Sequence, residues 1–145
     1  MPSGVTRFIG VLAGTGVAVA MAAAPAAAAG PTFKLRAPAV TASGSYHVML
    51  SIPERPVPPI QVRGTLAVSK RDRCGVVQIA YNGPADGIRW RTVGKRCGRG
   101  QTTFRARSGY LWGGLTPALR LCSGRTVERA ERGRQCDVHR PPADH

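Results

Sequence analysis

Residues 74–97 read CGVVQIAYNGPADGIRWRTVGKRC, and the spacing within this stretch decides the fold. Apolar and polar residues alternate on both sides of the turn-forming run NGPADG, a pattern that predicts a β-hairpin. An antiparallel register that places Tyr81 opposite Trp90 also places Cys74 opposite Cys97. Directly opposed residues lie about 4.5–5.5 Å apart at Cα, inside the range that a disulfide accepts. One register therefore allows both an aromatic contact and a covalent bond.

The first 29 residues have the organisation of a secretory signal peptide. Arg7 supplies a positive start, residues 8–24 are apolar or small, and Pro25 precedes the small residues AAA at 27–29. We expect cleavage before Gly30, which releases the remaining 116 residues. The alternative is a retained membrane anchor, since the run is barely long enough to span a bilayer. Its alanine and glycine content favours cleavage, so the sequence predicts a secreted, extracellular protein without stable membrane insertion.

Four cysteines lie in the exported part of the chain: Cys74, Cys97, Cys122 and Cys136. An even number in an oxidising environment predicts two disulfides. We favour the bonds Cys74–Cys97 and Cys122–Cys136, because they close two sequence-local hairpins; the two other pairings of four cysteines stay open. The gaps between the cysteines contain no C-x-x-C element, which argues against a zinc site.

Short alternating strands separated by glycine and proline clusters continue along the chain. They predict an all-β protein, a small antiparallel β-sandwich or barrel of seven to eight short strands with two disulfides. The single β domain is expected over residues 44–140, after a partly disordered segment 30–43 and before a tail at 141–145. The proline-rich run 52–60 is expected to cross the surface between strands. Residues 126–132 are the one helical candidate.

The chain carries 21 Lys and Arg against 7 Asp and Glu, a formal net charge of +14. Only Arg7 lies in the leader, so the exported part keeps a charge of +13. A GC-rich genome explains the use of arginine in place of lysine. It does not explain the shortage of acids, because Asp and Glu also have GC-rich codons. The charge therefore predicts polyanionic partners: cell-wall polymer, nucleic acid or acidic polysaccharide.

Arginines alternate with apolar residues along several of the predicted strands. Those on the outward parity form a candidate anion-binding face: Arg63, Arg89, Arg91, Arg105, Arg107 and Arg120. Lys95, Arg96 and Arg99 join them from an expected turn, since basic side chains there can grip phosphate, sulfate or carboxylate. Tyr110 and Trp112, in a glycine-bracketed loop, are candidate stacking residues for bases or sugars. The alternatives are a hydrated sheet face without a ligand and aromatic side chains that plug the core.

No catalytic constellation stands out, and we expect no cofactor and no metal. His47, His139 and His145 are the only histidines, and the sequence contains no G-x-S-x-G motif. Acidic residues are too scarce for a two-carboxylate glycosidase. A small secreted hydrolase stays as an alternative, in which His47 or His139 meets an acid in space.

The alanine-rich leader and three segments, CGVVQIAY at 74–81, IRWR at 88–91 and ALRLC at 118–122, resemble the short, exported, two-disulfide β proteins of high-GC Gram-positive bacteria. The resemblance implies a bacterial, extracellular β protein and carries no activity with it. In mature size and in its two expected disulfides the chain is also similar to the secreted subtilisin-inhibitor type of those organisms, in which an exposed loop after a cysteine enters a protease. The nearest counterpart of that loop is the stretch CSGRT at 122–126. That similarity implies a protease as partner, with Arg125 in the loop.

The leading hypothesis is a secreted, monomeric, non-catalytic β domain that binds anionic polymers or envelope surfaces through its arginines. Protease inhibition through Arg125 and hydrolysis are the two alternatives.

Overall fold

The structure is a computed structural model, and it describes residues 30–49, 59–109, 111 and 117–142. The predictions for the leader, for most of the run 52–60, for Tyr110 and Trp112, and for His145 fall outside these residues.

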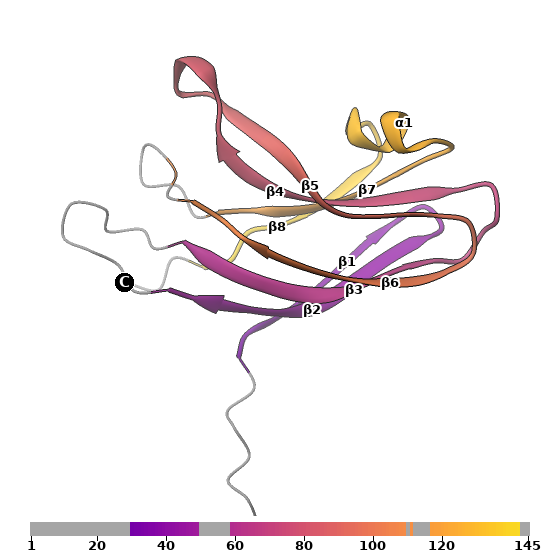
Figure 1. Cartoon of the computed structure of the whole chain (residues 1–145), viewed down its shortest axis with the longest axis horizontal. Coiled ribbons are helices and arrows are strands. Elements are labelled where there is room, and N and C mark those ends of the chain that lie inside the picture. The colour runs from indigo at the N-terminus through magenta and orange to yellow at the C-terminus, as the bar shows by residue number, and fades with distance from the viewer. Residues whose placement is uncertain (1–29, 50–58, 110, 112–116, 143–145) are drawn as a thin grey trace, which may run out of the picture.

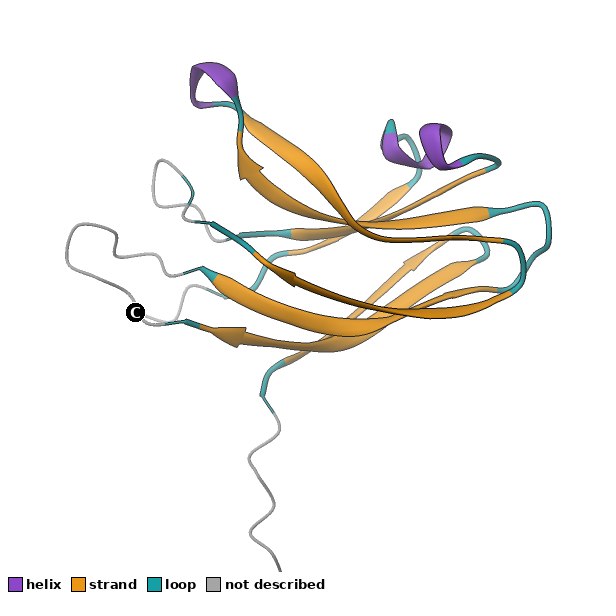
Figure 2. Ribbon diagram, in the orientation of Figure 1, coloured by secondary structure: helices purple, strands orange, loops and turns teal. Residues whose placement is uncertain are grey.

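Eight strands form two four-stranded antiparallel sheets, which confirms the predicted all-β sandwich (Figure 2). The first sheet has the strand order β1-β2-β3-β6 and the second has the order β5-β4-β7-β8. The strands are β1 (Thr32–Ala37), β2 (Val40–Val48), β3 (Ile60–Val68), β4 (Cys74–Asn82), β5 (Ile88–Cys97), β6 (Gly100–Arg107), β7 (Leu119–Gly124) and β8 (Cys136–His139). A 3-10 turn η1 (Pro84–Asp86) joins β4 to β5, and the helix α1 (Val127–Glu131) joins β7 to β8.

The chain crosses from one sheet to the other three times: between β3 and β4, between β5 and β6, and between β6 and β7. β3 and β6 are neighbours in the first sheet, and the strands that follow them, β4 and β7, are neighbours in the second sheet. Figure 1 shows the two sheets stacked face to face, with α1 on the side of the second sheet that faces away from the first. Neither sheet can therefore assemble completely without the other.

The core lies between the inner faces of the sheets, where apolar side chains of one parity meet. Its buried members are Phe33, Leu35, Val40, Ala42, Tyr46, Ile60, Val62, Leu66, Val68, Val77, Ile79, Phe104, Leu119 and Leu121. The alternation predicted for β2, β3, β6 and β7 holds: the outward neighbour of Val62, for example, is the exposed Arg63. Burial of these side chains is the main favourable contribution to folding.

The segment 30–43 is not disordered, contrary to the sequence-based expectation. It contains β1 and the first part of β2, and its few apolar residues are placed to alternate inward. Phe33 and Leu35 are buried, while Lys34 and Arg36 between them are exposed. The small and polar residues around Phe33 and Leu35 gave no clear strand pattern in the sequence. Burial of these two large side chains stabilises the strand.

One row of inward-facing residues across the first sheet has a phenylalanine at each end and two glycines between them. Phe33 in β1 lies opposite Gly44 in β2, Gly44 lies opposite Gly64 in β3, and Gly64 lies opposite Phe104 in β6. The two phenyl rings occupy the space over the glycines, with their centroids 6.3 Å apart. On the facing sheet, Gly94 of β5 also leaves room for Phe104, since a Cβ there would come 2.9 Å from the Cβ of Phe104.

Both predicted disulfides, Cys74–Cys97 and Cys122–Cys136, are formed, and they span 23 and 14 residues of sequence. Loops of these lengths are expected to contribute roughly 3 kcal/mol each through the entropy of the unfolded chain. Both bonds lie on the second sheet, where they join β4 to β5 and β7 to β8. The two bonds therefore fix the edges of the second sheet covalently.

The register of the β4–β5 hairpin was predicted correctly at its cysteine end and wrongly beyond Val77. Val77 lies opposite Gly94, but the next pair is Gln78 with Thr92, so Val93 is an extra residue on β5. This β-bulge shifts the register by one residue and reverses the faces of everything that follows. Trp90 accordingly lies opposite Ala80 and not opposite Tyr81.

The helix α1 confirms the helical candidate and has a role in packing. The Thr126 side chain accepts a hydrogen bond from the Arg129 backbone N–H and so caps its first turn. Ala130 is fully buried, and it packs with Val76 and Cys122. The helix thus covers part of the outer face of the second sheet.

We expect Gly64→Ala to lower the free energy of unfolding by about 1–3 kcal/mol, because the added methyl would lie 2.5 Å from the Ser43 carbonyl oxygen, 2.9 Å from the ring of Phe104 and 3.1 Å from that of Phe33. Urea unfolding of both proteins measures the difference. Gly109→Ala is the matched control, since nothing lies within 4 Å of a Cβ there. An unchanged stability of Gly64→Ala would contradict the close fit of the rings.

Candidate anion-binding surfaces

The outer face of the first sheet consists of cationic, hydroxyl, amide and imidazole side chains and one alanine. We call it the acid-free face. It is formed by Thr32, Lys34, Arg36, Thr41, Ser43, Ser45, His47, Gln61, Arg63, Thr65, Ala67, Gln101, Thr103, Arg105 and Arg107. None of these residues is an Asp or Glu, although the chain contains seven acids. Five of the fifteen are Lys or Arg, so the whole face presents positive charge and hydrogen-bond donors.

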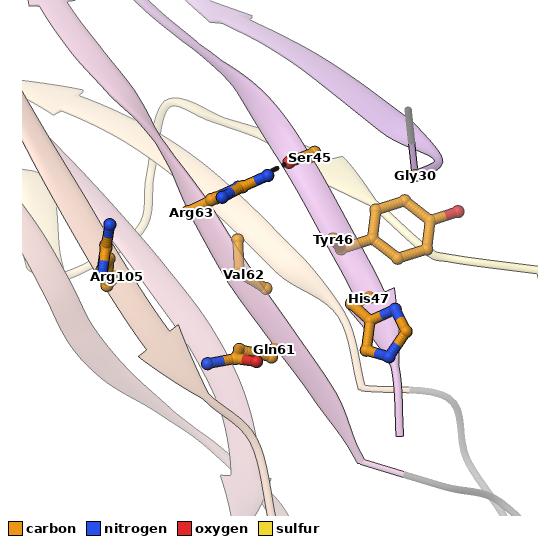
Figure 3. Close-up of a pocket in the computed structure, with 8 residues that line it drawn as sticks. All are labelled: Gly30, Ser45, Tyr46, His47, Gln61, Val62, Arg63 and Arg105. Carbon is orange, nitrogen blue, oxygen red and sulfur yellow. Dashed lines mark hydrogen bonds between the residues drawn. The ribbon is translucent and has the colours of Figure 1, made fainter. Parts of the chain in front are cut away.

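Arg63 and Arg105 lie directly opposite each other on β3 and β6. Together with Ser45, His47 and Gln61 they line a depression of about 310 Å³, which Figure 3 shows in close-up. The Arg63 Nε donates a hydrogen bond of 3.3 Å to the Ser45 Oγ. No carboxylate belongs to the described lining of this depression. The described lining therefore combines two guanidinium groups with hydroxyl, amide and imidazole groups.

The predicted arginine face is not one surface, because its members belong to both sheets. Of the nine predicted basic residues, the acid-free face holds Arg63, Arg105 and Arg107. The bulge places Arg89 and Arg91 on the inward parity of β5, opposite Tyr81 and Ile79.

The other hairpin residues have separate placements. Arg91 reaches the other sheet and donates a hydrogen bond of 2.9 Å to the Arg107 carbonyl. Arg96 donates to the Arg99 carbonyl at 3.2 Å, while its Nε is buried without a hydrogen-bond partner among the described residues. Lys95 and Arg99 are exposed on β5 and on the following turn. Arg91 thus links β5 to the end of β6, and Arg96 links β5 to the turn that precedes β6.

Arg120 is a structural residue that donates hydrogen bonds to two neighbouring segments. Its Nε donates to the Oε1 of the buried Gln78 at 2.7 Å, and its NH2 donates to the Glu131 carbonyl at 3.4 Å. The guanidinium carbon lies 4.4 Å from the centroid of the Trp90 ring. Thr92 completes the group by donating to the Glu131 Oε1 at 2.8 Å. Arg120 therefore joins β7 to β4, to β5 and to α1.

A second cationic surface lies around α1, and sequence reasoning missed it. Arg73, Arg125, Arg129, Arg132 and Arg134 line a pocket of about 420 Å³. Four of these five arginines occur within residues 125–134, and that local density was the one signal in the sequence. Arg73 is distant in sequence and is brought to the pocket by the loop that precedes β4.

The two described histidines have different surroundings. His47 lies on the acid-free face, where no described carboxylate lines its depression. His139 packs against Phe33 and Tyr46, with ring centroids 6.1 and 5.6 Å away, and the Asp137 carboxylate is near enough to act on its pKa. The hydrolase alternative stays a prediction. No cluster of His, Cys, Asp and Glu that suits a metal ion occurs in the described part of the chain.

Arg125 is exposed just ahead of α1. It is the one residue between the end of β7 at Gly124 and the helix cap Thr126, and it lines a pocket with four other arginines. Protease inhibition through Arg125 stays a prediction.

A scan against protein-family models, a search of curated proteins and a search of solved structures each give no significant match. Among the described residues, none of the helices is long and apolar enough to cross a membrane. The function must therefore be argued from the geometry and charge of the surfaces.

We expect Arg120→Met to lower the free energy of unfolding by about 1–3 kcal/mol, because it leaves the buried Gln78 carbonyl oxygen without its charged donor. Methionine keeps an apolar side chain over Trp90. Arg107→Met on the exposed face is the control, and we expect a change within about 0.5 kcal/mol. Equal effects of the two substitutions in urea unfolding would contradict the structural role of Arg120.

Acid should weaken the fold through His139. Burial lowers the pKa of His139 from its usual 6.5, and the nearby Asp137 opposes this only in part. Since the unfolded chain then takes up the proton first, this contribution to stability is complete above about pH 7 and decreases as the pH falls below 6.5. Urea midpoints of the wild type and of His139→Phe, compared between about pH 8 and about pH 5, measure it. A pH dependence unchanged by His139→Phe, or removed equally by His47→Gln, would contradict this assignment.

Proposed function

We propose that this chain is an exported, non-catalytic β-sandwich that binds linear anionic polymers through the acid-free face. The observation that carries the proposal is the complete lack of carboxylates among the fifteen outward side chains of β1, β2, β3 and β6. A face of this composition attracts polyanions. One carboxylate lies at its edge, where the Asp137 Oδ2 accepts a hydrogen bond of 2.9 Å from the Arg36 backbone N–H.

The opposed pair Arg63 and Arg105 supports binding on energetic grounds. Like charges directly opposite each other in a sheet are destabilising, by a few tenths of a kcal/mol up to about 1 kcal/mol. No carboxylate on this face compensates them. An anionic group lying across both guanidinium groups would remove the repulsion and gain two charge-assisted interactions.

The extent of the face favours a polymer over a small ligand. Its cations are distributed over three strands, from Lys34 and Arg36 on β1 to Arg105 and Arg107 on β6, and neighbouring strands lie about 4.8 Å apart. Serine, threonine and glutamine side chains occupy the positions between them. A chain with repeated anionic groups and hydroxyl groups can use both kinds of contact, whereas a single small anion reaches only one or two.

Export is part of the same proposal. Two disulfides and no free cysteine in the described residues suit an oxidising environment. Together with the leader-like first 29 residues, this supports action outside the cytoplasm, on cell-wall polymer, acidic polysaccharide or released nucleic acid.

The test is the salt dependence of binding to heparin and to duplex DNA. If several contacts release counterions, the logarithm of the binding constant should fall steeply with the logarithm of the salt concentration. The double variant Arg63→Gln/Arg105→Gln should bind more weakly and reduce that slope by about two. Elution of the wild type from both polymers at low salt would refute polyanion binding.

The matched control is Arg89→Gln/Arg140→Gln. Both residues are exposed, both lie outside the acid-free face, and the double variant loses the same net charge. We expect it to bind almost as the wild type does. Equal weakening by the two double variants would mean that net charge alone governs binding, and the acid-free face would lose its role.

A further inference from the structure

The pocket beside α1 gathers five guanidinium groups from three parts of the chain. Arg73 comes from the loop before β4, Arg125 precedes α1, and Arg129 lies on the helix. Arg132 and Arg134 follow the helix on the way to β8. The described remainder of the lining is Ser123, Gly124 and Gln135, so it contains no acid. A pocket of about 420 Å³ is of the size that holds a small molecule.

The helix carries two carboxylates, and both lie outside the lining. The Glu131 Oε1 accepts the hydrogen bond from Thr92 on the outer face of the second sheet. Glu128 does not line the pocket, and its pKa is lowered by hydrogen bonds with its own backbone and with Thr126 and, to a smaller extent, by the charge of Arg132. Glu128 thus offsets part of the charge of Arg132, and the described lining offers no carboxylate to the other four arginines.

The arginine-bearing segment is held in place before any ligand arrives. The Cys122–Cys136 bond closes the segment that carries four of the five arginines, and Cys74 of the other disulfide follows Arg73 directly. The Ser123 Oγ donates to the Pro38 carbonyl at 2.6 Å, and the Ser123 N–H donates to the Gln135 carbonyl at 3.0 Å. A fixed backbone lowers the entropy that is lost on binding.

We propose that this pocket binds a compact oligophosphate, a chain of a few phosphoryl groups. Each guanidinium can bind phosphate oxygens in a bidentate manner, so five of them in one pocket match an anion with several charged groups close together. A monophosphate or a carboxylate would leave most of the five without a partner.

This site is distinct from the acid-free face. Its described lining comes from the loop before β4, the end of β7, α1 and the segment that leads to β8, and it shares no residue with the acid-free face on β1, β2, β3 and β6. The proposal therefore does not rest on the proposed function, and each can fail without the other.

The experiment is titration of the full mature protein with tripolyphosphate by isothermal calorimetry at low and at physiological salt. The double variant Arg129→Gln/Arg132→Gln should bind about tenfold more weakly or worse, because both side chains are exposed pocket residues and their loss removes charged hydrogen-bond donors. Arg125→Gln/Arg134→Gln is a second pair with the same expectation. Unchanged thermal midpoints of the variants show that they are folded.

Two controls separate a built site from net charge. Arg63→Gln/Arg105→Gln removes the same charge from the other sheet and should bind tripolyphosphate as the wild type does. Citrate, a compact anion with three carboxylates, should bind at least about tenfold more weakly than tripolyphosphate. Equal weakening in all three double variants, equal affinity for citrate, or wild-type affinity in both pocket variants would overturn the proposal.

Discussion

Every cross-strand neighbour along the central hairpin is set by two constraints that act within a few residues of each other. The Cys74–Cys97 bond fixes where β4 and β5 meet, and the bulge at Val93 then shifts all later pairs by one residue. An unbroken register would have placed Trp90 opposite Tyr81, on the inner parity. The bulge turns it to the outer face instead, beneath Arg120. Arg120 in turn holds the Glu131 carbonyl, so the position of α1 depends on this one extra residue.

The acid-free face depends on how the opposite side of the same sheet is filled. The bulk of the inner row belongs to Phe33 and Phe104, while Gly44 and Gly64 between them contribute only backbone. Phe104 uses the space over Gly64 and over Gly94 of the facing sheet, so the two sheets approach closely at that point. With all large apolar side chains turned inward, the outer positions of four strands remain free for polar groups. The same alternation that builds the core thus produces an outer face with Lys or Arg on β1, β3 and β6.

Sequence patterns predicted the features that depend on nearby residues, which are most of the strands and the two disulfides. They did not predict features that depend on which distant segments come together. Cysteine spacing gave the disulfides, and period-two alternation gave most strands, because both are properties of short segments. The alternation failed at Val93, since a bulge leaves no mark in a polar and apolar pattern. The bulge therefore placed Arg89 and Arg91 on the inward parity of β5, and the strand order separated the other grouped arginines between two sheets. The pocket of five arginines needed Arg73 beside residues 125–134, a proximity that only the tertiary structure supplies.

The concentration of positive charge explains why covalent bonds matter in this small domain. Beneath α1 the apolar cluster contains only Val76, Cys122 and Ala130 as buried members, with Val127 and Cys136 partly buried. Burial of so little apolar surface opposes the mutual repulsion of the surrounding arginines only weakly. The Cys122–Cys136 bond restricts the unfolded chain instead, and its contribution of roughly 3 kcal/mol does not require a larger apolar surface at that site. A cationic pocket can therefore persist without a ligand, because the stability of its backbone comes from a covalent bond and not from neutralising carboxylates.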